Sequence, residues 1–130
     1  MQAIQTLLNS LMLNKKTNLE FNGFNLSFEL VEQDEEIHFS TSVYDGDNYV
    51  PPSVRSAIGE KVPFKDKSFS SFLTIDENQF KVVLHHLEPA KNIQPSTFYY
   101  QLDHFCFLAE EWRDYLDRND KRDLIYVRNP

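Results

Sequence analysis

The sequence predicts an α+β fold: a mostly antiparallel sheet flanked by an N-terminal helix and a long C-terminal helix, with a short irregular or helical middle segment. Three patterns support this prediction: helical spacing of apolar residues near the start of the chain, alternation through its middle, and a longer helical spacing near its end. At 130 residues the chain has the length of one domain. We therefore expect residues 1–130 to form a single domain.

The first helix is expected from Gln2 to Asn14. Its apolar face is formed by residues spaced three and four apart, namely Ile4, Leu7, Leu8 and Leu11. Met12 and Leu13 extend the apolar surface beyond one helical face. One packed face does not need that much apolar surface, so part of it is expected to be available to a partner.

Two strands are expected to meet in a hairpin at Asn22-Gly23. This dipeptide suits a two-residue turn whose central residues both take positive φ angles. It separates a short strand around residues 19–21 from a strand at 24–31 whose apolar and polar residues alternate. After a charged turn, a third strand is expected at 37–43.

The stretch 45–67 contains turn residues and two adjacent prolines, so it is expected to be irregular apart from one short helix. Ser53 is expected to cap this helix and Gly59 to end it. The sheet is expected to resume at Ser68 and to close with a strand at 80–87. Both faces of that strand carry apolar residues, so it is either buried on both sides or meets a partner.

The final helix is expected to open at Pro95-Ser96-Thr97. Its apolar stripe has spacings of three and four residues and consists of Phe98, Leu102, Phe105, Ala109, Trp112 and Leu116. We interpret this stripe as core. Beyond a charged stretch, Leu124–Val127 is expected to add a short edge strand.

The net charge of -7 and the pI of about 5.0 argue against binding to nucleic acid or to an anionic membrane surface. No apolar run approaches the roughly 20 residues that span a bilayer, and no signal peptide is visible. The single cysteine favours a reducing compartment. We therefore expect a soluble, cytoplasmic protein without membrane insertion.

No catalytic motif or metal-ligand spacing is readable in the sequence. His85 and His86 are neighbours in a strand and point to opposite faces, while His38 is expected on the polar face of another strand. Cys106 is expected to be a small core residue, because it diverges from His104 by about 200° on a helix. These patterns predict a protein that is not an enzyme and that needs no metal and no cofactor.

The order of the expected helices and strands, and several residues within them, resemble those of a known protein family. The matching residues are Leu7, Leu8 and Leu11; Leu19 to Gly23; Phe72 to Asp76; Phe80 to Leu84; and Leu102, Phe105, Leu108, Ala109, Glu110, Trp112 and Arg113. Over roughly residues 2–118 the chain resembles the class I type III secretion chaperones of bacteria, the Tir-chaperone family. The middle departs from this pattern, since residues 51–59 are only a loose counterpart of the family's small-residue stretch before its second helix.

The resemblance implies a homodimer in the bacterial cytoplasm that serves virulence. Each dimer would hold the N-terminal segment of a secreted effector extended and fit for export, without a cofactor or ATP for the binding step. The resemblance also implies grooves between the first helix and the sheet, for which the candidate partner-binding residues are Ile4, Leu8, Leu11, Phe28 and Phe39. The candidate dimer-interface residues are Val83, His85 and Leu87.

Two other functions remain open from the sequence. An acidic immunity or adaptor protein would cap one partner by electrostatic fit, and salt would weaken its binding strongly. A small α+β enzyme would instead need a deep pocket in which His86, His104 or Asp103 converge. A flat dimer with exposed apolar strips would oppose the enzyme.

Overall fold

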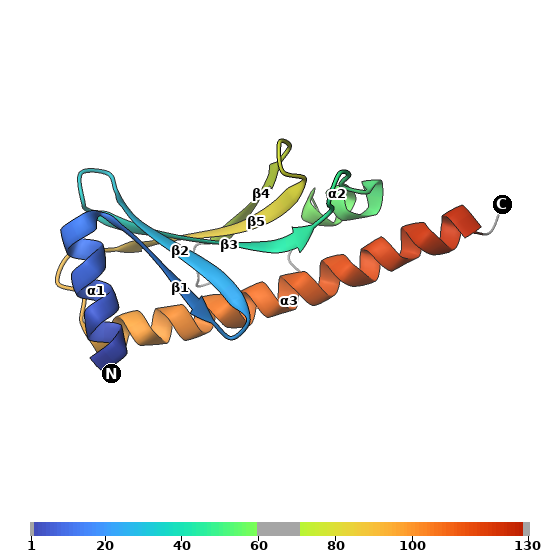
Figure 1. Cartoon of the computed structure of the whole chain (residues 1–130). Helices are drawn as coiled ribbons and strands as arrows, with labels where there is room; N and C mark the ends of the chain where they lie inside the picture. The colour runs from blue at the N-terminus through green and yellow to red at the C-terminus, as the bar shows by residue number, and fades with distance from the viewer. Residues whose placement is uncertain (1, 60–70, 129–130) are drawn as a thin grey trace.

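A computed structural model describes residues 2–59 and 71–128 of the chain. Figure 1 shows the arrangement of its helices and strands. In chain order these elements are α1 (Gln2–Asn14), β1 (Lys16–Phe21), β2 (Phe24–Val31), β3 (Glu36–Asp45), α2 (Pro52–Gly59), β4 (Ser71–Asp76), β5 (Lys81–Pro89) and α3 (Pro95–Arg128).

The strands form one antiparallel five-stranded sheet in the order β1-β2-β3-β5-β4. The helices α1 and α3 pack against the same core as the buried side of the sheet. Figure 1 shows α3 running beneath the sheet and continuing past its end, while α1 closes the opposite end. The predicted α+β fold, with its antiparallel sheet and two flanking helices, is confirmed.

The β1–β2 hairpin turns as its sequence predicts. Asn22 has a φ of 52° and Gly23 a φ of 83°, so both central residues of the turn are left-handed. The register brings Phe21 opposite Phe24 and leaves only these two residues between the strands. This turn sets which residues of β2 face the core, because a slip of one residue would reverse the faces.

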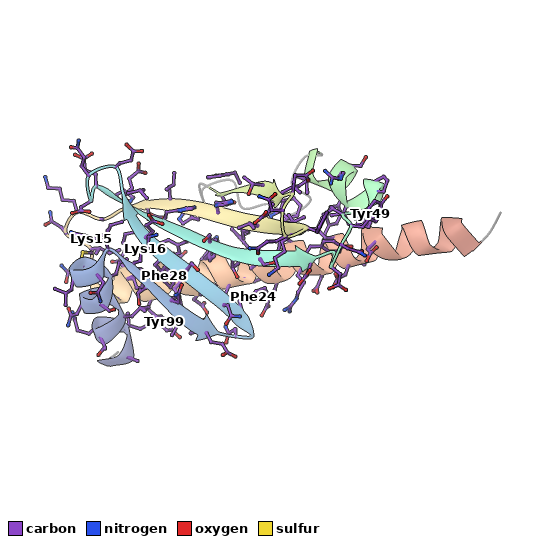
Figure 2. The ribbon with its side chains drawn as sticks, turned by 45° about the horizontal axis from the view of Figure 1, so that its top comes forward. Lys15, Lys16, Phe24, Phe28, Tyr49 and Tyr99 are labelled. Atoms are coloured by element: carbon purple, nitrogen blue, oxygen red, sulfur yellow. The ribbon has the colours of Figure 1, made fainter. Side chains whose placement is uncertain are left out.

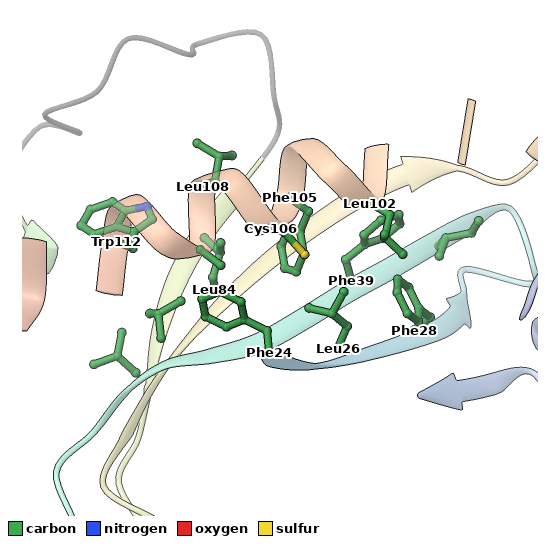
Figure 3. Packing of buried hydrophobic residues seen from close by; sticks show 14 of the residues in the cluster. Phe24, Leu26, Phe28, Phe39, Leu84, Leu102, Phe105, Cys106, Leu108 and Trp112 are labelled. Carbon is green, nitrogen blue, oxygen red and sulfur yellow. The ribbon is translucent and has the colours of Figure 1, made fainter. Parts of the chain in front are cut away.

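The apolar stripe of α3 is the main helical contribution to the core. Its six predicted residues are all buried, with Phe98, Leu102, Phe105, Ala109 and Leu116 at 0% exposure and Trp112 at 4%. They meet the buried side of the sheet, where β2 and β3 alternate strictly between buried and more exposed residues over most of their length. Figure 3 shows how Phe105 and Leu102 of α3 approach Phe39 of β3.

Two boundaries differ from the sequence predictions. The residues Leu124–Val127 belong to α3 and not to an edge strand. A helix satisfies its backbone hydrogen bonds within the segment, whereas an edge strand would need a neighbouring strand. The short middle helix was placed correctly to within one residue, but it begins at Pro52, and the Pro51 carbonyl accepts from the amides of Val54 and Arg55. Ser53 is therefore not its cap, and Ser68 lies outside the described residues.

None of the described helices combines the length and the apolarity needed to cross a membrane. The long helix α3 is no exception, because charged residues recur along it.

Gly46 supports the turn that follows β3, and a Gly46→Ala variant is expected to lose about 1–3 kcal/mol of unfolding free energy. The Gly46 amide donates to the Phe80 carbonyl at 2.8 Å, which ties this turn to the turn before β5. A Cβ atom at Gly46 would lie 2.1 Å from the Tyr49 carbonyl oxygen, so the backbone would have to move. Urea unfolding measures the loss. Asn48→Ala in the same turn is the control, and an equal loss in both variants would contradict the steric cause.

Candidate partner-binding surfaces

The sheet has a second face that no described helix covers. Strand alternation and register place three polar residues of β3, three residues of β5 and two of β4 on this face. They are His38, Ser40, Ser42, Val83, His85, Leu87, Phe72 and Thr74. The predicted dimer-interface residues Val83, His85 and Leu87 thus share one face, where each is half-buried. Whether a second copy covers this face stays a prediction.

His38 and His85 meet on this face, although they are 47 residues apart in the chain. His38 Nε2 and His85 Nδ1 are 2.8 Å apart, and His85 Nε2 lies 2.7 Å from Thr74 Oγ1. The Phe72 ring stacks against the other side of His85 at 4.8 Å. Burial, and secondly the charge of His38, lower the pKa of His85 from its usual value. This cluster holds the most closely associated titratable side chains on the uncovered face.

The five candidate groove residues lie inside the core. Their exposed fractions are 8% for Ile4, 4% for Leu8, 0% for Leu11, 1% for Phe28 and 0% for Phe39. The apolar face of α1 packs onto β1, β2 and α3, so the chain's own side chains fill the space between helix and sheet. Figure 3 shows Phe28 and Phe39 in the packed layer between the sheet and α3. Contact of these residues with a partner stays a prediction, and it would require α1 to move.

The exposed apolar side chains gather in a few places. Met12 and Leu13 lie in the last turn of α1 and are 39% and 80% exposed, so this part of the helix carries apolar surface outside the core. On α3, Tyr99 is 41% exposed, and its ring meets Phe21 of β1 edge to face at 6.4 Å. Figure 2 shows Tyr99 between α1 and the hairpin of β1 and β2. Sequence analysis missed Tyr99, because the helical stripe beside it dominates the pattern.

The strand β1 is an edge strand, since among the described strands it pairs with β2 alone. The Lys15 carbonyl accepts from the Leu30 amide at 2.9 Å, so the backbone groups of alternate residues from Lys15 onward point toward β2. Those of Asn18 and Glu20 therefore point away from the sheet, where another strand can pair. The half-buried side chains of Leu19 and Phe21 border this edge.

A polar hollow of about 240 Å³ lies on the uncovered face of β1, β2 and β3. Its lining residues are Lys16, Thr17, Asn18, Ser27, Phe28, Glu29, His38 and Ser40. Lys16 Nζ and a Glu29 carboxylate oxygen lie 3.9 Å apart at its rim. Most of the lining side chains are small or neutral, and no nucleophile and base are paired there, so the hollow suits contact with a polypeptide better than catalysis.

The residues of the alternative enzyme do not converge. His86 is 0% exposed, packs beside Phe39 and Phe105, and bonds through Nε2 to Glu88 Oε1 at 2.6 Å. His104 instead lies on the outer side of α3, where its ring contacts Tyr100. Within residues 2–59 and 71–128, no group of three or more possible metal ligands comes together. The geometry therefore does not favour a His/Asp pocket.

Cys106 is expected to react with alkylating reagents at least about 100-fold more slowly in the native protein than in urea. Its side chain is 1% exposed, and burial raises the pKa of the thiol to about 12, with smaller contributions from Asp103 and Glu110. Alkylation at about pH 8, followed by mass spectrometry with and without urea, measures the ratio. Comparable rates in the two states would contradict the prediction that Cys106 is a core residue.

No protein-family model and no curated protein sequence matches this chain significantly. Solved structures do match. A chain of the ExsC-ExsE complex is 15% identical, with a TM-score of 0.61, over 88% of this chain and 93% of that one. A chain of the HopA1-SchA chaperone-effector complex is 12% identical, with a TM-score of 0.54, over 88% of this chain and 98% of that one.

The third match comes from a structure of the type III secretion chaperone SycH of Yersinia pestis, in complex with a stable fragment of YscM2. The matched chain is 10% identical, with a TM-score of 0.52, and the match covers 82% of this chain and 96% of that one. These matches agree with the element order and the sheet described above. The chain therefore has the fold of the class I type III secretion chaperones, as the resemblance in its sequence predicted.

Proposed function

We propose that this chain is a type III secretion chaperone that binds a secreted effector in the bacterial cytoplasm. The observation that carries the proposal is the fold that it shares, over 88% of its length, with a chain of the HopA1-SchA chaperone-effector complex. Its acidic surface, its exposed apolar side chains and its open strand edge fit a protein that binds another polypeptide. Such binding requires contacts only, without catalysis or a cofactor.

The effector segment binds in extended form along the edge of β1. Asn18 and Glu20 offer outward-pointing backbone groups there, so an added strand can continue the sheet. Alternate side chains of that strand would reach Leu19, Phe21 and Tyr99, which border the same edge. Main-chain hydrogen bonds supply affinity that does not depend on sequence, and the apolar border selects segments with apolar side chains.

The end of α1 extends this binding surface. Leu13 is 80% exposed and Met12 39%, directly before the start of β1. Ile4, Leu8 and Leu11, together with Phe28 and Phe39, form the packed layer beneath this surface. In this proposal they support the exposed residues, and an effector reaches them only where α1 shifts.

Two copies of the chain form the working unit. The proposed interface is the uncovered face of β4 and β5, where Val83, His85 and Leu87 lie beside Phe72. Phe72 is 48% exposed, and its ring stacks on His85 beside the apolar side chains of Val83 and Leu87. A second copy would bury this ring and the adjoining apolar side chains.

The proposal is tested with the N-terminal segment of a secreted protein that co-purifies with the chain. Light scattering should give a mass near twice 15.3 kDa for the free protein, and titration calorimetry should detect binding of the segment. Hydrogen exchange should protect β1, while the segment itself stays without globular structure. Raising the salt from about 0.05 M to about 0.5 M should weaken binding less than tenfold.

Each alternative predicts a different result. An immunity or adaptor protein would bind a folded domain, and its affinity would fall steeply with salt. A segment that acquires a globular fold when bound, or binding that leaves β1 unprotected, would contradict the proposed mode.

A further inference from the structure

The uncovered face of the sheet carries a row of three rings across β3, β5 and β4. The rings of His38 and His85 are parallel to within 5°, with centroids 5.0 Å apart. Phe72 continues the row on the other side of His85, at 4.8 Å and 9°. Val83 and Leu87 lie on the same face of β5, one on each side of His85. His85 therefore has apolar neighbours on β4 and β5, while Ser40 of β3 lies opposite it.

The hydrogen bonds of the pair depend on how many protons it holds. One proton between His38 Nε2 and His85 Nδ1 makes a hydrogen bond at their distance of 2.8 Å. The Thr74 hydroxyl, 2.7 Å from His85 Nε2, can either donate or accept. With one added proton, His85 donates to both neighbours and all contacts remain. With two added protons, N–H groups of the two rings face each other, and the contact must open.

The charged groups around the pair do not remove this conflict. Among the described residues, the charged side chains that the register places on this face are Lys16, Glu20, Glu29, Glu36, Asp45, Asp76 and Lys81. Glu29 is the register partner of His38, and it is the carboxylate that Lys16 approaches at 3.9 Å. Asp76 and Lys81 face each other at the far end of β4 and β5. The helices α1 and α3 pack on the opposite side of the sheet.

We propose that His38 and His85 act as one proton-sensitive unit that controls pairing of the uncovered face with a second copy of this chain. The neutral pair presents an uncharged surface, bordered by Phe72, Val83 and Leu87, that a second copy can cover. In the doubly protonated pair, the two rings separate and the face gains positive charge. A second copy would remove water from that charge, so double protonation opposes dimer formation. This inference rests on the homodimer proposed above.

The sign of the pH dependence follows from the environment of His85. Burial and the charge of His38 lower its pKa in the folded single chain, so the unfolded chain takes up protons more readily. A second copy over this face would remove more water from a charged imidazole, so the separated chain would take up protons more readily than the dimer. Stability and pairing from this site are therefore present above the usual histidine range and are lost as the pH falls below it.

The test measures the dimer dissociation constant by sedimentation at about pH 7.5 and about pH 5, which bracket histidine titration. The wild type should dissociate at least about tenfold more readily at the lower pH. A His38→Gln variant should lose the part of this dependence that comes from double protonation, and a His85→Gln variant should lose most of it. His104→Gln on α3 is the matched control and should keep it. Proton NMR of the wild-type imidazoles should show two coupled titration steps for His38 and His85.

The outcomes separate this inference from the proposed function. A dimer that is equally stable at both pH values, with both imidazoles titrating independently, would overturn the inference and leave the homodimer intact. A monomer at about pH 7.5 would overturn the proposed homodimer itself, and the inference with it. If His38→Gln fails to fold, the NMR titration and the wild-type dissociation constants still decide the matter.

Discussion

A Phe39→Ala variant is expected to lose about 3–5 kcal/mol of unfolding free energy, a large part of the roughly 5–15 kcal/mol typical of a domain. The Phe39 ring is 0% exposed. Its centroid lies 5.1 Å from that of Phe28, 5.7 Å from that of Phe98 and 5.6 Å from that of Phe105. Removing it leaves a cavity between β2, β3 and α3 that these rings cannot close without leaving their own contacts.

Denaturant unfolding at a fixed protein concentration measures this loss, because association would make the apparent stability depend on concentration. Phe107→Ala is the matched control, since Phe107 is also a phenylalanine but is 53% exposed on α3. Its loss should stay near or below about 1 kcal/mol. Equal losses in the two variants would show that the aromatic cluster around Phe39 is not the centre of the core.

The periodic elements of this fold could be predicted from sequence because each is decided by residues close together in the chain. The stripe from Phe98 to Leu116 needs only a helix to become continuous, and all its residues are buried. The hairpin at Asn22-Gly23 needs only two residues that tolerate positive φ. Leu124–Val127 was wrongly placed in a strand, because its apolar residues fit both the helical and the strand spacing. Only the continuation of α3 through this segment decides between a helix and a strand.

The division between core and partner surface could not be predicted in the same way. Leu8 and Leu13 are chemically identical and lie on one helix, yet their exposed fractions are 4% and 80%. An apolar side chain carries no sign of whether its own chain or a partner covers it. The packing of α1 on the sheet and on α3 decides this, and that packing depends on residues far apart in the sequence.

The histidine pair shows the same limit for polar residues. Strand alternation correctly placed His85 and His86 on opposite faces and His38 on the polar face. Their meeting depends on the register of β3 with β5, in which Ser40 is opposite His85 and His38 is opposite Leu87. Register between strands 47 residues apart is set by the whole sheet, so the contact could be found only in the structure.

An Asn18→Pro variant is expected to bind the effector segment about 10- to 100-fold more weakly while it keeps its fold. The bond from the Leu30 amide to the Lys15 carbonyl places the Asn18 amide on the outer side of β1. Proline removes that donor, and its ring obstructs a strand that pairs there. The hydrogen bonds between β1 and β2 remain, so the unfolding free energy should change by no more than about 1 kcal/mol.

Titration calorimetry with the effector segment measures the affinity, and urea unfolding measures the stability. Asn18→Thr is the matched control, because it changes the same side chain but keeps the backbone amide, and it should bind within about threefold of the wild type. Weaker binding by Asn18→Pro alone would mean that the main-chain edge of β1 receives the segment. If Asn18→Pro binds as tightly as the wild type, the segment does not pair with β1, and the edge of β4, the other strand paired on one side only among those described, becomes the surface to test.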